Sequence, residues 1–214
     1  MNEQLRIQDI LTALNISATS QQTLREYPPI TCIANGESEL HEEGHVARVV
    51  LDADIVCRAL EAQDIAVNRH AVLSAIRIHD SHRRKDHEVE QCHGQYAAEH
   101  AREVGTFDND KDAELILQLA QWHSVDDHDI CQALGVDELP LELQILKDAD
   151  ALDRVRDHYH ESKGKGLDPD FLRLEESHTL IPLAQALCER YYADNHDNPL
   201  EAIISIGSEM GIII

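Results

Sequence analysis

Six residues, far apart in this chain, carry side chains that bind divalent metal ions through nitrogen or oxygen. They are His45, the adjacent pair His79-Asp80, His93, His123 and Asp150. The pair closes an apolar run, and at the end of a helix an imidazole and the next carboxylate can reach the same cation. Imidazole and carboxylate ligands with few thiolates suit iron, manganese, nickel or zinc rather than a sulfur-rich structural site. The order H…HD…H…H…D therefore predicts a metal site.

Taken one at a time, the histidines also have an ordinary structural interpretation. The chain has fourteen of them, so any single one says little. His123 shares an apolar stripe with Ile116 and Leu119, where a hydrogen-bonded core histidine is the commoner finding, and His93 is equally ambiguous. The set favours a metal, because ligands from several helices often converge in the core of a bundle. Three further histidines are expected to support the site or face solvent: His82, His87 and His100.

The carboxylate of Asp150 belongs to an apolar helical stretch that is expected to face the core. Burying a carboxylate is costly unless it is paired or coordinated. Asp148 and Asp153 lie within three positions of it, and such a cluster of negative charge repels itself. A cation is the simplest remedy, with salt bridges from Lys147 and Arg154 as the alternative.

The elements that must position these residues are predicted to be helices. Apolar periodicity and helix-end signals predict helices over 5–14, 44–63, 68–80, 91–104, 110–123, 141–160 and 179–193. His45 then lies in the first turn of its helix, and Asn68 caps the helix that ends near His79-Asp80. Residues 81–90 are charged and lack apolar periodicity, which predicts a loop. The apolar tail over 202–214 is expected to dock on the core, with a homodimer contact as the alternative.

The fold class predicted from these patterns is all-α. Aliphatic residues dominate and aromatic residues make up only 4% of the chain, which favours packed helices over a strand-rich sandwich. A length of 214 residues suits one domain with one substantial core. We expect a single compact domain over 1–214 with seven to nine helices. Its metal-binding core covers about 40–160, and the terminal helices cover that core.

Composition narrows the classes of partner and the compartment. The net charge of −23 opposes binding to nucleic-acid polymers and to anionic membranes. The five cysteines are scattered, odd in number and without a CxxC pair, which is typical of a reducing compartment. The N-terminal residues lack the apolar core of a secretory signal, and no apolar stretch reaches membrane-spanning length. We therefore expect a cytoplasmic protein.

The ordered set H…HD…D resembles the HD-domain superfamily of metal-dependent phosphohydrolases. The resemblance covers about residues 40–160, includes the segment Asp-Ala-Asp-Ala-Leu-Asp at 148–153, and extends to the H-x-x-R-V stretch that begins at His45. It implies that one ion is held by His45, His79, Asp80 and Asp150. His93 and His123 match the extra histidines of the dinuclear subset, in which Asp80 bridges two ions. The predicted cofactor is thus one or two divalent ions, with two preferred, from among Fe, Mn, Ni, Zn and Mg.

Two departures limit the resemblance. Many relatives carry His-Gly where this chain has His41-Glu42. The Gly-Lys that follows the doublet in the cyclic-dinucleotide branch is replaced by His82-Arg83, and there is no GYP signature. That branch is disfavoured.

The chemistry implied is hydrolysis of a phosphate ester or anhydride in a small molecule, with nucleotides as the preferred class. A divalent ion lowers the pKa of a bound water and neutralises phosphoryl oxygens, and phosphoryl transfer depends chiefly on positioning and charge stabilisation. Asp80 bridges the ions, or holds the attacking water if there is only one. Because the chain is acidic, local cations must contact the phosphate. Arg83 and Lys147 are the preferred contacts, whereas Arg84 and Lys85 fit surface charges better, and Arg48 lies one turn from His45.

Two other functions remain open. A small branch of the same fold uses six ligands in this order for a mixed-valent di-iron oxygenase, and His93 and His123 supply the extra imidazoles. The other is a ligand-sensing module without catalysis, although intact ligands at every position argue against a degenerate site.

Overall fold

A computed structural model of the protein describes residues 3–30, 43–83, 93–158 and 166–214. Within these ranges all regular elements are helices, apart from an isolated parallel bridge between Thr19 and Ile213. The predicted all-α class is confirmed. The described ranges contain ten α-helices rather than seven to nine. The additional ones are the short α2 (Gln21–Glu26) and α8 (Asp127–Leu134), which have no long apolar stripe, and α11 (Pro199–Met210), which forms much of the apolar tail.

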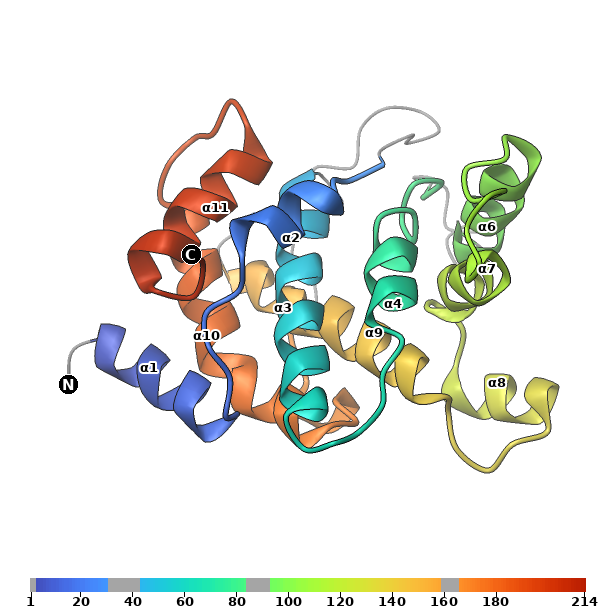
Figure 1. The fold of residues 1–214 in the computed structure, drawn as a ribbon, viewed down its shortest axis with the longest axis horizontal. Helices are drawn as coiled ribbons and strands as arrows, with labels where there is room; N and C mark the ends of the chain where they lie inside the picture. Colours follow the sequence, from blue (N-terminus) through green and yellow to red (C-terminus); the bar gives the residue numbers. More distant parts are fainter. Residues whose placement is uncertain (1–2, 31–42, 84–92, 159–165) are drawn as a thin grey trace.

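The helices pack around one central element, α3, as Figure 1 shows. The α-helices in chain order are α1 (Glu3–Ala13), α2 (Gln21–Glu26), α3 (Glu43–Glu61), α4 (Arg69–Ile76), α6 (His93–Glu103), α7 (Ala113–Trp122), α8 (Asp127–Leu134), α9 (Leu141–Leu152), α10 (Glu175–Tyr192) and α11 (Pro199–Met210). Two 3₁₀ segments, η1 (Asp153–His158) and η2 (Pro169–Phe171), lie between α9 and α10. Helices α4, α9, α10 and α11 contact α3, whereas α7 packs onto α4 and α6 packs against α7.

Helix α3 is buried along nearly its whole length, every residue from Gly44 to Cys57 included. Full burial of an apolar side chain such as Leu51 or Ile55 contributes about 1.5–3 kcal/mol. The same helix carries charged residues, and these must find partners inside the protein. Asp54 accepts hydrogen bonds from Arg69 Nε (2.6 Å) and Thr19 Oγ1 (2.9 Å), which tie α3 to α4 and to the segment before α2.

Helix α4 ends earlier than the sequence predicts. Asn68 caps its start as expected, since its side chain accepts a hydrogen bond from Ala71 N. The α-helix stops at Ile76, however, and i→i+3 bonds continue the chain through tight turns, including Ser81 N to Ile78 O and Arg83 N to Asp80 O. The His79-Asp80 pair therefore lies in a turn just beyond the helix rather than at its last residue.

The remaining predicted helices differ from the observed ones mainly at their ends. The helix predicted over 44–63 is confirmed as α3, and the one over 110–123 is confirmed as the shorter α7. The helix predicted over 141–160 is α-helical only to Leu152 and then tightens into η1. The C-terminal tail docks on the core as predicted. Ile212 and Ile213 are buried, and Ile212 O accepts a hydrogen bond of 2.7 Å from Thr19 N.

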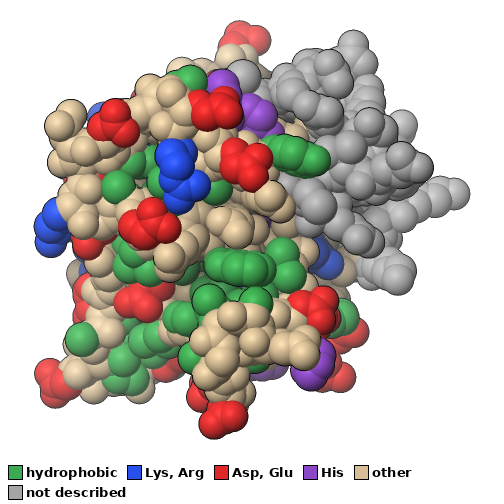
Figure 2. All heavy atoms as spheres, turned by 90° about the vertical axis from the view of Figure 1, so that its right-hand side faces the viewer, with side chains coloured by type: hydrophobic (Ala, Val, Ile, Leu, Met, Phe, Trp, Pro, Cys, Tyr) green, Lys and Arg blue, Asp and Glu red, His purple; other side chains and the backbone are tan. Residues whose placement is uncertain are grey.

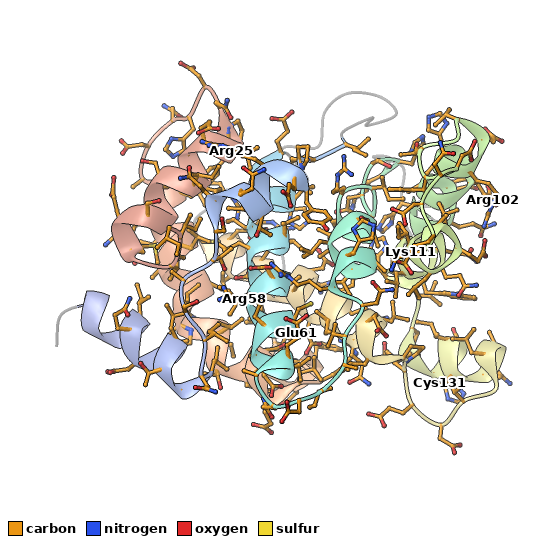
Figure 3. The ribbon with its side chains drawn as sticks, in the orientation of Figure 1. Arg25, Arg58, Glu61, Arg102, Lys111 and Cys131 are labelled. Carbon is orange, nitrogen blue, oxygen red and sulfur yellow. The ribbon has the colours of Figure 1, made fainter. Side chains whose placement is uncertain are left out.

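Charged side chains occupy the outside of this bundle. Asp and Glu outnumber Lys and Arg on the face in Figure 2, in keeping with the acidic sequence. Figure 3 labels Arg102 at the outer edge of α6, where its guanidinium reaches Glu114 of α7 at 3.3 Å. Among the described helices, none combines the length and apolar character that crossing a bilayer requires.

Candidate metal centre

The six predicted ligands come from five places in the fold and meet at one point. The first turn of α3 supplies His45, the turn after α4 supplies His79 and Asp80, and the last turn of α9 supplies Asp150. The remaining two, His93 and His123, come from the first residue of α6 and the residue after α7. Their ligand atoms form two groups, each with all atoms within 4.8 Å of one another, that could hold a metal ion.

The first group, which we call the inner half, contains His45, His79, Asp80 and Asp150. His45 Nε2 lies 3.3 Å from Asp80 Oδ2 and 3.4 Å from Asp150 Oδ1. His79 Nε2 lies 3.3 Å from the same Asp80 oxygen and 3.7 Å from Asp150 Oδ1. The two Nε2 atoms are 3.3 Å apart. Two imidazoles and two carboxylates thus surround one small volume.

The second group, the cleft half, contains His93, His123 and again Asp80. His93 Nε2 lies 3.0 Å from Asp80 Oδ1, and His123 Nε2 lies 3.5 Å from it. The two Nε2 atoms are 2.9 Å apart. Asp80 therefore presents one carboxylate oxygen to each half, so its carboxylate could contribute a ligand to a cation in either half.

Helix ends orient two of the imidazoles. The last carbonyls of an α-helix lack an intrahelical partner. His79 Nδ1 donates to Ile76 O of α4, and His123 Nδ1 donates to Ala120 O of α7, both at 2.7 Å. Each ring thereby keeps a proton on Nδ1, and its Nε2 is directed into the centre. Ring orientation by such an outer hydrogen bond is usual for histidine ligands of metals.

A carboxylate plays the same part for His45. Its Nδ1 donates to Asp153 Oδ2 at 2.7 Å, and both side chains are buried. Arg156 Nη1 also lies 3.4 Å from His45 Nδ1. Because Asp153 is ionised and its oxygen is closer, Nδ1 keeps its proton and donates it to Asp153. Burial alone would raise the pKa of Asp153, yet the guanidinium groups of Arg48 and Arg156 hold that pKa well below its usual range.

Arg48 and Arg156 give Asp153 its charge partners. Arg48 Nε donates to Asp153 Oδ1 at 2.5 Å, and Arg156 Nη1 donates to Oδ2 at 2.7 Å. The guanidinium of Arg48 also lies over the rings of Tyr191 and Tyr192, at 4.7 and 5.3 Å from their centroids. Arg48 is therefore a fully buried structural cation behind His45, and it does not reach the cleft.

Behind this network lies a second buried acid, Asp52. Burial raises the pKa of its carboxyl well above the usual value, and the charge of Asp153 adds to the effect. The side chain is 1% exposed, and its Oδ1 has no hydrogen-bond partner among the described residues. Burial and the charge of Asp153 thus favour the protonated, neutral form of Asp52 in the folded protein.

The charges in the centre favour a cation in the inner half. Burial by itself would lower the pKa of His79, but the carboxylates of Asp80 and Asp150 outweigh it and raise that pKa to about 10. Burial lowers the pKa of His123 to about 4, because Asp80 is its one carboxylate neighbour and two imidazoles lie beside it. Without a metal, a proton on His79 balances the paired carboxylates. A divalent ion would take over that role and release the proton.

The centre lies against a cleft of about 740 Å³, within the usual range for small-molecule sites. Its lining includes the ligands His93, His123 and Asp150. The two predicted phosphate contacts also line it. Arg83 lies next to the centre, with its Nη1 3.6 Å from Asp80 Oδ1. Lys147 is more deeply placed and is only 8% exposed.

The ammonium of Lys147 is already engaged. It forms an ion pair with Asp127 at 2.7 Å and a short hydrogen bond to Val125 O. Burial lowers the pKa of Lys147, and Asp127 partly offsets that shift. The predicted salt-bridge alternative, in which Lys147 neutralises the aspartates near Asp150, is therefore wrong. Asp148 instead pairs with Arg173, whose Nη1 lies 2.9 Å from Asp148 Oδ1. Arg154, the other partner proposed there, is exposed and lines the cleft.

Other predicted participants lie beside the centre or beyond the described residues. His82 and His100 pack ring against ring, with centroids 4.5 Å apart, outside the two ligand groups. The residues His41, Arg84, Lys85 and His87 lie outside the described ranges.

The orienting role of Asp153, with Arg48 and Arg156, was missed by reasoning from the sequence. A signal existed. Asp153 and Arg156 are three residues apart and therefore share a helix face, and Arg48 lies three residues after His45.

Comparisons with known proteins add no identification. No family model matches the chain, and no curated protein or solved structure matches it significantly. The HD-domain resemblance thus stays a prediction.

Proposed function

We propose that this protein is a metal-dependent phosphohydrolase of the HD type that hydrolyses a phosphate ester or anhydride in a small molecule, with nucleotides as the preferred class. The main support is Asp80, whose two oxygens face two separate groups of imidazoles and carboxylates at a cleft. A buried centre of this composition, next to a cleft that also contains arginines, fits phosphate chemistry better than a purely structural site.

The residues present fit one or two divalent ions. In three of the four histidines, Nδ1 donates outward and leaves Nε2 directed at the centre. The inner half would hold the first ion, and His93, His123 and the second oxygen of Asp80 would hold the other. When bound, such ions supply an activated water and neutralise charge on phosphoryl oxygens.

The chain itself then positions the substrate and compensates its charge. Arg83 and the exposed Arg154 both line the cleft and can contact phosphoryl oxygens. Preorganised cations of this kind stabilise charge that develops in the transition state. Lys147 acts indirectly, because its bonds to Asp127 and Val125 O fix the segment that follows His123. The net charge of −23 makes these local cations necessary for binding any phosphate.

The test combines elemental analysis of the purified protein with phosphate release from nucleotides and sugar phosphates under Mn²⁺, Fe²⁺, Ni²⁺, Zn²⁺ and Mg²⁺. Bound metal and metal-dependent phosphate release are expected, and His79→Ala should lose both. His178→Ala is the control, because His178 of α10 belongs neither to the cleft lining nor to any group that could hold a metal ion among the described residues.

Three results would overturn the proposal. An active, metal-free His79→Ala variant would remove the metal from the mechanism. Oxygen consumption with an organic substrate, together with an iron-specific spectrum and no phosphate release, would favour the di-iron oxygenase. Tight binding of a phosphorylated ligand without turnover under any of the metals would favour a sensing module.

A further inference from the structure

An aromatic side chain stands exposed in the same cleft as the candidate metal centre. Phe171, the last residue of η2, is 64% exposed and lines the cleft, whereas Phe107, the other phenylalanine of the chain, is 8% exposed. The next residue, Leu172, is buried at 6%. An exposed phenyl ring gains little from folding, and in a cleft it is accessible to a ligand.

The backbone that carries Phe171 is held firmly. Asp168 caps η2, because its Oδ1 accepts a hydrogen bond of 3.1 Å from Asp170 N. After the ring, Arg173 N donates to Asp148 Oδ2 at 2.9 Å, and its Nη1 donates to Phe171 O at 3.0 Å. The ring is therefore presented by a fixed segment, and a ligand would bind it with little loss of conformational freedom.

A continuous set of polar contacts connects this segment to the metal centre. Arg173 Nη2 lies 2.8 Å from Asp127 Oδ2, and Asp127 Oδ1 lies 2.7 Å from Lys147 Nζ. Lys147 in turn bonds Val125 O, two residues after His123. These contacts satisfy the charges of Lys147 and Arg173 within the protein. The apolar part of the cleft lining includes Phe171 and Leu167, and the exposed Arg154 and Asp168 add charge to the same lining.

From this arrangement we propose that Phe171 is a stacking platform for a flat aromatic ring of the substrate. The ligand carries its phosphate at the metal centre beside Arg83 and its ring against Phe171. This inference rests on the proposed function for the phosphate end, and it narrows the substrate to phosphate compounds with an aromatic group. Purines and pyrimidines meet that requirement, because each presents a π-face that stacks on aromatic side chains.

The experiment compares two probes that differ by the ring alone, adenosine 5′-monophosphate and ribose 5-phosphate. Their dissociation constants are measured by calorimetry with the full-length protein loaded with Mn²⁺, together with phosphate release from each. The wild type should bind the nucleotide about tenfold more tightly than the sugar phosphate.

Substitutions at position 171 then separate stacking from simple apolar contact. Phe171→Leu should remove most of the preference and leave ribose 5-phosphate binding within about twofold, whereas Phe171→Trp should keep the preference. Leu134→Ala is the control, since Leu134 is 42% exposed outside the cleft lining. Equal affinity of the wild type for the two probes, absence of binding by both, or a preference that survives Phe171→Leu would each overturn the inference. Absence of phosphate release from every compound would instead count against the hydrolase, while the calorimetric comparison would still test the platform.

Discussion

The two halves of the candidate metal centre share Asp80 but differ in ligands and support. The inner half has two imidazoles and two carboxylates, and buried Asp153 backs its His45. The cleft half has two imidazoles and only the shared carboxylate, and both of its histidines line the cleft. The difference shows how one cluster can both retain an ion and bind substrate. In the inner half, more negative charge and firmer support of the ligands favour retention of an ion. In the cleft half, fewer protein ligands leave coordination positions open for water and substrate.

The pKa values of the histidines express the same contrast. His79 meets the carboxylates of both Asp80 and Asp150, which raise its pKa to about 10 against the effect of burial. Burial dominates at His123 and lowers its pKa to about 4. The inner half therefore attracts positive charge on its own. The cleft half depends on the one oxygen of Asp80 that faces it.

Removing the shared charge should have the largest effect. Asp80→Asn keeps the size of the side chain but takes a charged ligand from both halves, so we expect loss of both ions and a fall in turnover of more than about a thousandfold. Elemental analysis and phosphate release measure the two effects. Asp54→Asn is the control, because Asp54 is also buried and paired, with Arg69 and Thr19, but belongs neither to the ligand groups nor to the cleft lining. Retention of two ions by Asp80→Asn would show that the halves do not share this carboxylate.

Removing one half at a time tests whether the halves are unequal. His123→Ala should leave one tightly held ion, because the four inner ligands stay in place. His45→Ala should lower the affinity for the first ion and reduce the total content further. Titration with Mn²⁺ followed by elemental analysis distinguishes the variants. Identical metal content in the two would contradict the proposed difference in retention.

Weakening the support behind His45 should have a smaller, more selective effect. Asp153→Asn removes the charge that orients this imidazole, and we expect metal affinity of the inner half to fall about 10–100-fold. The buried guanidinium groups of Arg48 and Arg156 lose their partner, so stability should fall by about 3–5 kcal/mol. Asp148→Asn is a matched control on the neighbouring α9, because Asp148 is equally buried but pairs with Arg173. An equal loss of metal affinity in both variants would reduce Asp153 to a stability role.

Local patterns in the sequence predicted most of the helical frame. Helix α3 could be predicted because the apolar spacing after His45 lies within that one helix. The start of α4 could be predicted because the cap at Asn68 depends only on residues next to it in the sequence. The convergence of the six ligands followed from the resemblance and from the helical frame together. The end of α4 at Ile76 could not be predicted, because the residues beyond it continue as i→i+3 turns with the same apolar spacing.

Partners that come from distant elements were out of reach of such patterns. Sequence proximity suggested Lys147 and Arg154 as counter-ions for the aspartates of α9. Helix geometry instead directs Lys147 to Asp127, and the real partner of Asp148 is Arg173, 25 residues further along the chain. Charge pairing within a bundle depends on which faces meet. Packing determines this, whereas the spacing within one helix does not.

The smallest expected effect concerns Asp52, the neutral acid behind the inner half. Its pKa is raised in the folded protein by burial and by Asp153, so it keeps its proton at pH values where the unfolded chain has lost it. The native state then binds more protons than the unfolded state. The stability that Asp52 contributes is therefore present below its unfolded pKa of about 4 and is lost as pH rises above it, by at most about 1.4 kcal/mol per pH unit.

Asp52→Asn keeps the shape and removes the titration, so it should be more stable than the wild type above about pH 4, and the gap in stability should widen as the pH rises toward the pKa of Asp52 in the folded protein. Thermal unfolding measures this gap, with about 2–4 °C of Tm for each kcal/mol in a chain of this size. Asp64→Asn, at an exposed position after α3, should show no such trend. A constant or shrinking gap would mean that Asp52 is ionised in the fold. The buried network behind His45 would then carry one more negative charge than the arrangement of Arg48 and Arg156 around Asp153 implies.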